Sequence, residues 1–230
     1  MSVYVIGDTH LSFSTDKPMN IFKGWDDYEF RLESNWQKLV EANDTVVIVG
    51  DISWGMSLEE SAKDFEFLNK LNGKKIILKG NHDYWWNTAT KMNKFLEEKG
   101  FNSISFLHNN AFSIDNIAVA GSRGWFFDAE KENTDKVLAR ECERLQRSID
   151  AAKELGGEVV VFLHYPPISS FKDCDPIVDV LVRNNIKRCY YGHLHGGAIK
   201  GAFNGEKYGI DFRLVSADYL EFCPLHIKSK

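Results

Sequence analysis

Residues 74–83 read KKIILKGNHD, in which an apolar run ends at a glycine and three polar residues. The run Lys74–Lys79 is typical of a buried β-strand, because aliphatic and β-branched residues fit a pleated surface that is covered on both faces. Four more runs of this kind each lead into polar residues: Val3–Ile6, Thr45–Val49, Glu158–Leu163 and Arg188–Tyr191. The sequence therefore predicts strands with polar residues at their ends.

Helical patterns separate these strands, with apolar residues at intervals of three and four. They cover Tyr28–Ala42, Leu58–Leu71, Thr88–Lys99, Asn133–Leu155 and Ile177–Asn184. Two stretches break the alternation, since Phe106–Gly121 has the pattern of a hairpin and Ala198–Ile227 is rich in predicted strands. Alternating elements followed by consecutive strands predict an α/β fold with two mixed sheets packed face to face and helices outside, an α-β-β-α sandwich.

The chain shows no linker, low-complexity tract or long repeat. Its 230 residues suit one large α/β domain, in which roughly 70% of the unfolded surface can be buried. We therefore expect a single domain over residues 1–230, with its polar motifs in residues 7–195 and with the strand-rich residues 198–230 completing the second sheet.

Charge and hydropathy restrict the partners that we expect. With 28 Lys and Arg against 33 Asp and Glu, the formal net charge is −5, which argues against binding to duplex nucleic acid through its phosphates. The N-terminus lacks the basic region of a signal peptide, and no run approaches the roughly 20 apolar residues of a membrane span. We expect a cytoplasmic protein with no membrane partner, and the sequence leaves the oligomeric state open.

Polar motifs directly follow the five predicted strands. They are Gly7–His10, Gly50-Asp51, Gly80–Asp83, His164 and Gly192–His195. Ligands of α/β sheets bind outside the carboxyl ends of the strands, where side chains from separate strands converge. Asp, Asn and His supply the oxygen and nitrogen donors that suit Mn²⁺, Fe²⁺ and Zn²⁺. The pattern therefore indicates a metal site at this edge of the fold.

In this order, the motifs resemble those of the calcineurin-like metallophosphoesterases, D-x-H, G-D, G-N-H-D/E, H and G-H-x-H. The resemblance covers residues 7–195 and extends to small prokaryotic-type phosphohydrolases of that superfamily. It implies two divalent metal ions, of manganese, iron or zinc, whose identity the sequence leaves open. The implied ligands are Asp8, His10 and His195 for the first ion and Asn81, His164 and His193 for the second, with Asp51 bridging both.

The same resemblance implies catalytic roles for the two residues that follow Asn81. His82 would lie beside the phosphate as a general acid or as a hydrogen-bond donor, and Asp83 would hold the His82 imidazole in position. A local turn cap is the alternative role for Asp83. Metal coordination lowers the pKa of water, so a hydroxide between the two ions would attack the phosphorus atom.

The motifs do not name a substrate, although a small phosphodiester or phosphomonoester is the class that the resemblance implies. Arg123, between two glycines after the predicted hairpin, is a candidate to bind a phosphate through its guanidinium. The segment Leu11–Asp27 is either a lid or pocket wall, or an ordinary loop. Four aromatic residues near the motifs either contact an organic group or pack in the core. They are Trp54, Tyr84, Trp85 and Trp86.

Two alternatives to a small-molecule phosphohydrolase come from other classes. One is a nuclease or nucleic-acid-processing phosphodiesterase, although the basic residues form no stripe along the sequence. The other is a non-catalytic scaffold on the same fold. The intact ligand positions and His82 argue against the scaffold, since members that lost catalysis usually have these residues replaced.

Overall fold

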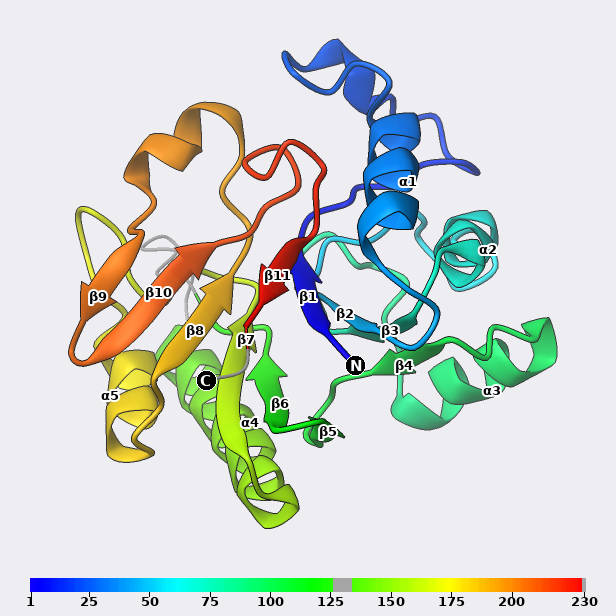
Figure 1. Cartoon of the computed structure of the whole chain (residues 1–230). Helices are drawn as coiled ribbons and strands as arrows, with labels where there is room; N and C mark the ends of the chain where they lie inside the picture. Colours follow the sequence, from blue (N-terminus) through cyan, green and yellow to red (C-terminus); the bar gives the residue numbers. More distant parts are fainter. Residues whose placement is uncertain (126–133, 229–230) are drawn as a thin grey trace.

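The computed structural model describes residues 1–125 and 134–228, which form two mixed β-sheets with helices on both sides (Figure 1). The first sheet has the order β11 (Leu225–Ile227), β1 (Val3–Ile6), β2 (Thr45–Ile48), β3 (Lys74–Ile77) and β4 (Ile104–Phe106). The second has the order β5 (Phe112–Ile114), β6 (Ile117–Ser122), β7 (Glu158–Leu163), β8 (Arg188–Tyr191), β10 (Ile210–Leu214) and β9 (Gly205–Lys207).

The helices divide between the two sheets. Beside the first sheet in Figure 1 lie α1 (Tyr28–Leu39), α2 (Ala62–Lys70) and α3 (Ala89–Lys99). Beside the second lie α4 (Thr134–Leu155) and α5 (Asp175–Arg183). Two short 3-10 helices, η1 (Met19–Ile21) and η2 (Gly196–Gly201), belong to connections. The predicted α-β-β-α sandwich is confirmed, although Asn133, the predicted start of the long fourth helix, lies outside the described residues.

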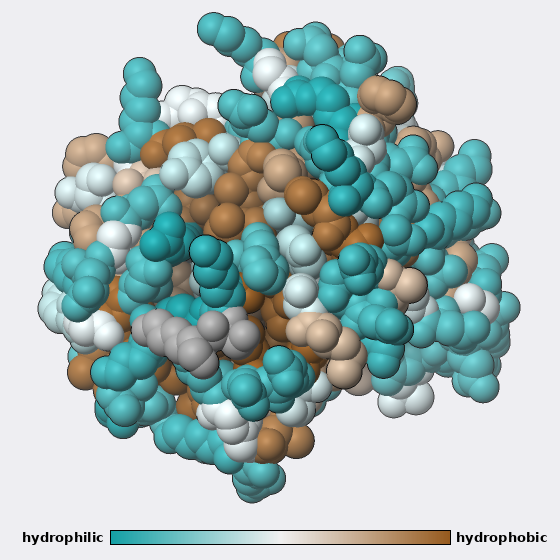
Figure 2. All heavy atoms as spheres, viewed as in Figure 1, coloured by the Kyte–Doolittle hydropathy of each residue, from teal (hydrophilic) through white to brown (hydrophobic). Residues whose placement is uncertain are grey.

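Three apolar layers follow from the alternation of side chains along the strands. In β2 and the residue after it, Val47 and Val49 face the layer between the two sheets, whereas Val46 and Ile48 face the layer under α1–α3. Because both faces of β2 are covered, all four of its residues are buried, which explains its continuous apolar run. Figure 2 shows that polar side chains cover most of the outer surface in this view, with apolar atoms exposed among them near its middle.

The parallel pairing of the strands sets the place of the site. Within the first sheet β1, β2 and β3 are parallel, and so are β6, β7 and β8 in the second. Beyond β1 and β10 the backbone of Gly7 pairs with the segment after β10, donating to the Val215 carbonyl at 2.7 Å and accepting from Ala217 N at 2.9 Å. This link joins the two sheets where the carboxyl ends of their strands meet.

Two predictions about the strands need correction. Residues 198–230 do not all complete the second sheet, because β11 pairs antiparallel with β1 in the first sheet, with Ile227 opposite Val3. β11 thereby covers the edge of β1, which would otherwise expose unpaired backbone groups. The hairpin is also shorter than predicted, since Phe106 ends β4 of the first sheet and the hairpin of the second begins at Phe112.

Candidate metal centre

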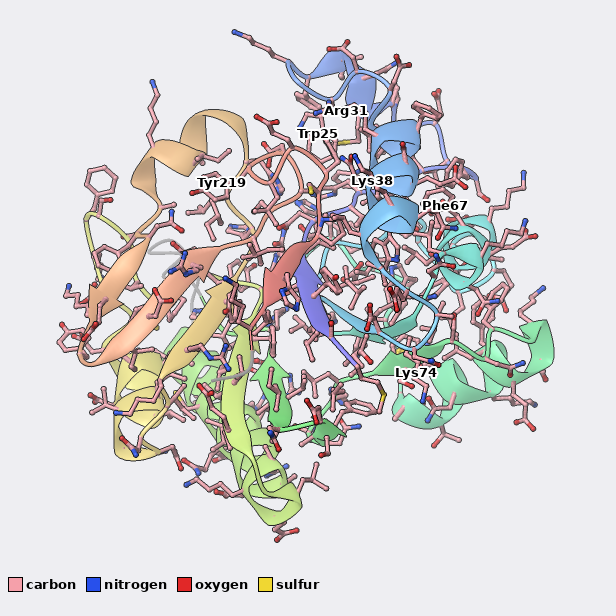
Figure 3. All side chains as sticks on the ribbon, in the orientation of Figure 1. Trp25, Arg31, Lys38, Phe67, Lys74 and Tyr219 are labelled. Atoms are coloured by element: carbon pink, nitrogen blue, oxygen red, sulfur yellow. The ribbon has the colours of Figure 1, made fainter. Side chains whose placement is uncertain are left out.

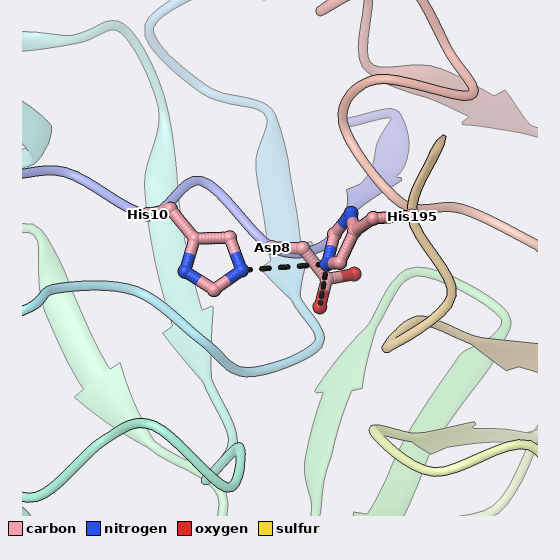
Figure 4. A group of neighbouring side chains, drawn as sticks. All are labelled: Asp8, His10 and His195. Carbon is pink, nitrogen blue, oxygen red and sulfur yellow. Dashed lines mark hydrogen bonds and ion pairs between the residues drawn. The ribbon is translucent and has the colours of Figure 1, made fainter. Parts of the chain in front are cut away.

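Three of the predicted ligands form a first group at the ends of β1 and β8. Asp8, His10 and His195 each place one ligand atom within 4.8 Å of the others (Figure 4). His195 Nε2 lies 3.3 Å from Asp8 Oδ1 and 3.3 Å from His10 Nε2. These are the three residues that the family resemblance implies as ligands of the first ion, and they lie close enough together to hold one.

A second group lies at the ends of β2, β7 and β8. Asp51, His164 and His193 likewise each place one ligand atom within 4.8 Å of the others. The amide oxygen of Asn81 adds a fourth donor, 2.6 Å from His164 Nε2 and 2.9 Å from His193 Nδ1.

Asp51, a member of the second group, also faces the first group. Its Oδ2 atom is 3.7 Å from His10 Nε2 in the first group and 3.5 Å from His164 Nε2 in the second. One carboxylate oxygen therefore faces an imidazole nitrogen of each group, which is the position that a bridging ligand requires.

The chemistry of the donors fits divalent cations. Nδ1 of His164 lies 2.9 Å from the Val49 carbonyl, and burial lowers the pKa of this imidazole, so the neutral ring donates from Nδ1. The Nε2 lone pair then points at another acceptor, the Asn81 amide oxygen, at 2.6 Å. A divalent cation that binds both atoms would accept these two lone pairs.

The two buried carboxylates of the site also favour the binding of cations. Asp8 and Asp51 are 0% and 1% exposed. Burial, and next the charge of Asp8, raise the pKa of Asp51 to about 8. Burial alone would raise the pKa of Asp8 as well, but His195 holds it below its ordinary value. Bound cations would compensate these carboxylates in a place where isolated charge is costly.

The backbone at the ligands has an unusual conformation. Asp8, His10, Asp51 and His193 have φ values of 58°, 44°, 51° and 74°, in the left-handed region that few residues other than glycine adopt. Such residues cluster at functional sites, where the surrounding structure holds them in place.

The glycines of two motifs leave room for the carboxylates. A Cβ atom on Gly80 would overlap Asp51 Oδ1 and its backbone nitrogen, and one on Gly192 would overlap Asp8 Oδ2. The motifs need glycine at these positions because the loops approach each other too closely for any side chain.

His82 lies beside both groups without belonging to either. Its backbone N–H donates to Asp51 Oδ1 at 2.8 Å. The half-buried imidazole has its centroid 5.8 Å from that of His10 and 4.7 Å from the ring of Trp54. Its Nδ1 is 3.4 Å from the Tyr84 hydroxyl. The position suits contact with a bound substrate, and the catalytic role stays a prediction.

The expectation that Asp83 holds the His82 imidazole is wrong. Its carboxylate instead accepts four N–H donors, from the backbone of Asp51 at 3.0 Å, Ile52 at 2.8 Å and Gly80 at 2.7 Å, and from the Trp85 indole at 3.0 Å. A fully buried carboxylate collects such donors because they replace lost water. Asp83 therefore fixes the backbone around Asp51, as a turn cap would.

Sequence reasoning missed Asp218. Its Oδ1 lies 3.1 Å from His195 Nδ1, and its Oδ2 accepts from Gly196 N at 2.8 Å. This contact leaves Nε2 of His195 facing Asp8. Carboxylates commonly orient metal-binding imidazoles in this way, by contacting the other ring nitrogen. Asp218 follows β10 in a turn, and no local pattern distinguishes it from other turn aspartates.

The remaining predicted residues lie around the centre. Arg123 is not among its ligands, but its carbonyl accepts from His164 N at 3.2 Å, which places it next to the second group. Of the four aromatic residues, Trp85 is buried in the core, Trp86 is partly buried against the same core, Tyr84 is 53% exposed, and Trp54 stacks on His10.

The segment 11–27 forms a wall of the site. Trp25 has its ring centroid 5.9 Å from the centroids of both His10 and His195, and it packs edge-on against Phe222 at 5.0 Å. Figure 3 shows Trp25 between α1 and the loop that follows β10. These contacts favour a pocket wall over an ordinary loop for this segment.

The comparisons with known proteins give the family. The model of the calcineurin-like phosphoesterases matches residues 1–197. This is most of the chain, and the protein belongs to that family. An uncharacterized protein from Methanocaldococcus jannaschii is 30% identical over 86 residues, which are 35% of this chain and 46% of that protein. The match thus spans less than half the length of that relative.

Solved structures share the fold at low sequence identity. A phosphopantetheinyl hydrolase from Mycobacterium tuberculosis has a TM-score of 0.54 at 12% identity, covering 100% of this chain and 96% of that one. A protein of unknown function from Aquifex aeolicus has a TM-score of 0.53 at 17% identity, with 98% and 95% covered. Within residues 1–125 and 134–228, the structure has no helix that is both long enough and apolar enough to cross a membrane.

Proposed function

We propose that the protein is a dinuclear metal-dependent phosphohydrolase that acts on a small phosphodiester or phosphomonoester. The observation that supports this most is the pair of ligand groups on either side of Asp51. Two divalent ions bound there would polarise a phosphoryl oxygen and activate a water molecule at neutral pH. Manganese, iron and zinc all suit these donors.

The residues of the chain have separate tasks in this proposal. Asp8, His10 and His195 would hold one ion, Asn81, His164 and His193 would hold the other, and Asp51 would contribute to both. His82, anchored by its backbone to Asp51, donates a proton or a hydrogen bond to the phosphate as the ester bond breaks.

Arg123 in this proposal binds an anionic group of the substrate. It lines a cavity of about 160 Å³ together with Lys79, His108 and Arg144. Its Nε atom is buried without a hydrogen-bond partner among the described residues, and its Nη2 is 3.9 Å from the buried Glu141. Three cationic side chains around one carboxylate leave an excess of positive charge for a phosphate. Unchanged kcat and KM in Arg123→Ala would contradict this role.

The test of the proposed function compares bis(p-nitrophenyl) phosphate with p-nitrophenyl phosphate on protein stripped with chelator and reloaded with Mn²⁺. We expect turnover that requires metal, and the ratio of the two rates gives the preference between diester and monoester. Asp51→Asn should lose both metal and activity, whereas His82→Ala should lose about 10²–10⁴-fold in rate while retaining metal.

Metal content and rate separate the roles of these residues. A metal-free His82→Ala protein would contradict the division between ligands and proton donor. No turnover of either ester with Mn²⁺, Fe²⁺ or Zn²⁺, in protein whose metal content is two ions per chain, would count against hydrolysis of small esters.

A further inference from the structure

An apolar pocket opens directly beside the candidate metal centre. It has a volume of about 430 Å³, and His10, His82 and His195 form its inner end. Met19, Phe22, Trp25 and Trp54 supply most of the rest of its lining. The volume lies within the range of about 300–1,000 Å³ that is usual for small-molecule sites.

The pocket walls contact the same imidazoles that surround the centre. The Trp54 ring stacks on His10 with a centroid distance of 4.9 Å, and it lies 4.7 Å from His82. Trp25 approaches His195 from the other side, at 5.9 Å. If the phosphate of an ester lay at the centre, its organic group would therefore extend between the two indole rings.

The lining offers little to a polar group. The indole N–H of Trp54 already points at the Met19 sulfur, at 3.4 Å. Apart from the histidines, Lys23 is the one ionisable side chain among the described residues that line the pocket, and it is exposed. A sugar or a base would lose its hydrogen bonds to water on entering, whereas an alkyl or aryl group would lose none.

The apolar surface continues outward from the pocket. A second hollow of about 270 Å³ shares Met19, Phe22 and Trp54 with the first, and its lining is completed by Asp16, Lys17, Pro18 and Ile21. Ile21 and Phe22 are 72% and 54% exposed at the end of η1. Contiguous exposed apolar side chains that adjoin a site are a common mark of a ligand-binding groove.

We propose that this pocket binds the leaving group of the substrate, and that the substrate is a phosphate ester of an apolar alcohol several carbons long. The inference rests on the proposed function, because it takes the phosphate to lie at the candidate metal centre. It adds the chemical class of the ester, which the ligands do not determine.

Binding of n-alkylphosphonates tests the proposal without turnover. The series from ethyl- to octylphosphonate keeps the headgroup constant and varies the buried chain alone. On Mn²⁺-loaded protein, titration calorimetry should give a Kd that falls with each added methylene, by up to about fourfold where the methylene is fully buried. The same order should appear in competitive inhibition of p-nitrophenyl phosphate hydrolysis.

Two variants locate the effect. Phe22→Ala removes a half-exposed wall residue, and we expect the ratio of Kd between ethyl- and octylphosphonate to shrink at least about tenfold. Phe30→Ala is the matched control, because Phe30 is 70% exposed on α1 and does not line the pocket. It should leave the whole series unchanged.

The outcomes distinguish the two proposals. A Kd that does not vary with chain length, in protein that hydrolyses the aryl esters, would overturn the apolar pocket and leave the phosphohydrolase standing. If the Kd values of the series were the same in Phe22→Ala as in the unchanged protein, the alkyl chain would not lie in this pocket. Absence of both phosphonate binding and turnover in metal-loaded protein would refute the proposed function itself.

Discussion

Replacing Asp83 by asparagine tests whether this residue holds the backbone of the candidate metal centre. Oδ1 of Asp83 accepts from Ile52 N and the Trp85 indole, and Oδ2 accepts from the backbone N–H groups of Asp51 and Gly80. In either orientation of the asparagine amide, its NH₂ group faces two N–H donors. The substitution therefore removes the oxygen that accepts from two N–H groups and creates donor–donor contacts at a site that is 1% exposed.

The expected loss follows from those two donors. Each buried donor without an acceptor costs about 1–3 kcal/mol, so Asp83→Asn should lose about 2–6 kcal/mol in the free energy of unfolding. With a urea m-value of about 3 kcal/mol/M, a loss of about 3 kcal/mol lowers the unfolding midpoint by about 1 M. Because Asp51 and Gly80 would shift, metal affinity should also fall, by about 10–100-fold.

Asp44→Asn is the control for the loss of a buried carboxylate. Asp44 is 6% exposed and accepts from Ser2 N at 2.7 Å and Glu41 N at 3.0 Å, at the opposite end of β2 from the centre. Its replacement should cost about 1–2 kcal/mol and leave metal content unchanged. If Asp83→Asn keeps its unfolding midpoint and its metals but loses rate as His82→Ala does, Asp83 acts through His82 and the reasoning fails.

Two further predictions concern side chains behind the site and between the sheets. Asp218→Ala frees the His195 imidazole, so metal affinity measured with a competing chelator should fall about 10–100-fold, while Asp211→Ala, which breaks a surface ion pair, should leave it unchanged. Arg188→Met breaks the paired 2.8 Å contacts to Glu158 and the 2.7 Å contact to the Lys228 carbonyl after β11. Urea unfolding should show a loss of about 2–4 kcal/mol, against less than about 1 kcal/mol for Arg213→Met at an exposed pair.

The strands that precede the motifs were predictable because their sequence signal is local. Val3–Ile6, Glu158–Leu163 and Arg188–Tyr191 coincide with β1, β7 and β8. Helix ends were less predictable: α1 ends at Leu39, where Val40 turns to extended backbone, although the apolar pattern continues to Ala42. Partner choice was not predictable for β11, since three residues with an exposed centre fit the edge of either sheet.

The candidate metal centre shows the same difference between local sequence signals and long-range contacts. Most side chains of the two ligand groups come from motifs that begin with a glycine, and His164 directly follows a predicted strand. The order of the five motifs along the chain could therefore be read from the sequence. Asp218 and the contacts of Asp83 depend on which distant backbone atoms lie nearby, so the sequence offered two roles for Asp83 and none for Asp218. Residues that act through long-range contacts become visible only once the loops are placed.

Backbone hydrogen bonds between the first two motifs help to hold the left-handed residues of the candidate metal centre. Asp8 and His10, both at positive φ, donate at 2.9 Å to the carbonyls of Gly50 and Asp51, and Leu11 donates at 2.9 Å to Ile52. A left-handed residue costs about 1–2 kcal/mol, and a backbone hydrogen bond contributes about 1 kcal/mol. The ladder between the loops after β1 and β2 therefore offsets much of the cost at each ligand. Since Asp83 holds Asp51 and Ile52 from the other side, hydrogen bonds of the protein itself arrange the candidate ligands, and we expect cation binding to require little reordering of the backbone.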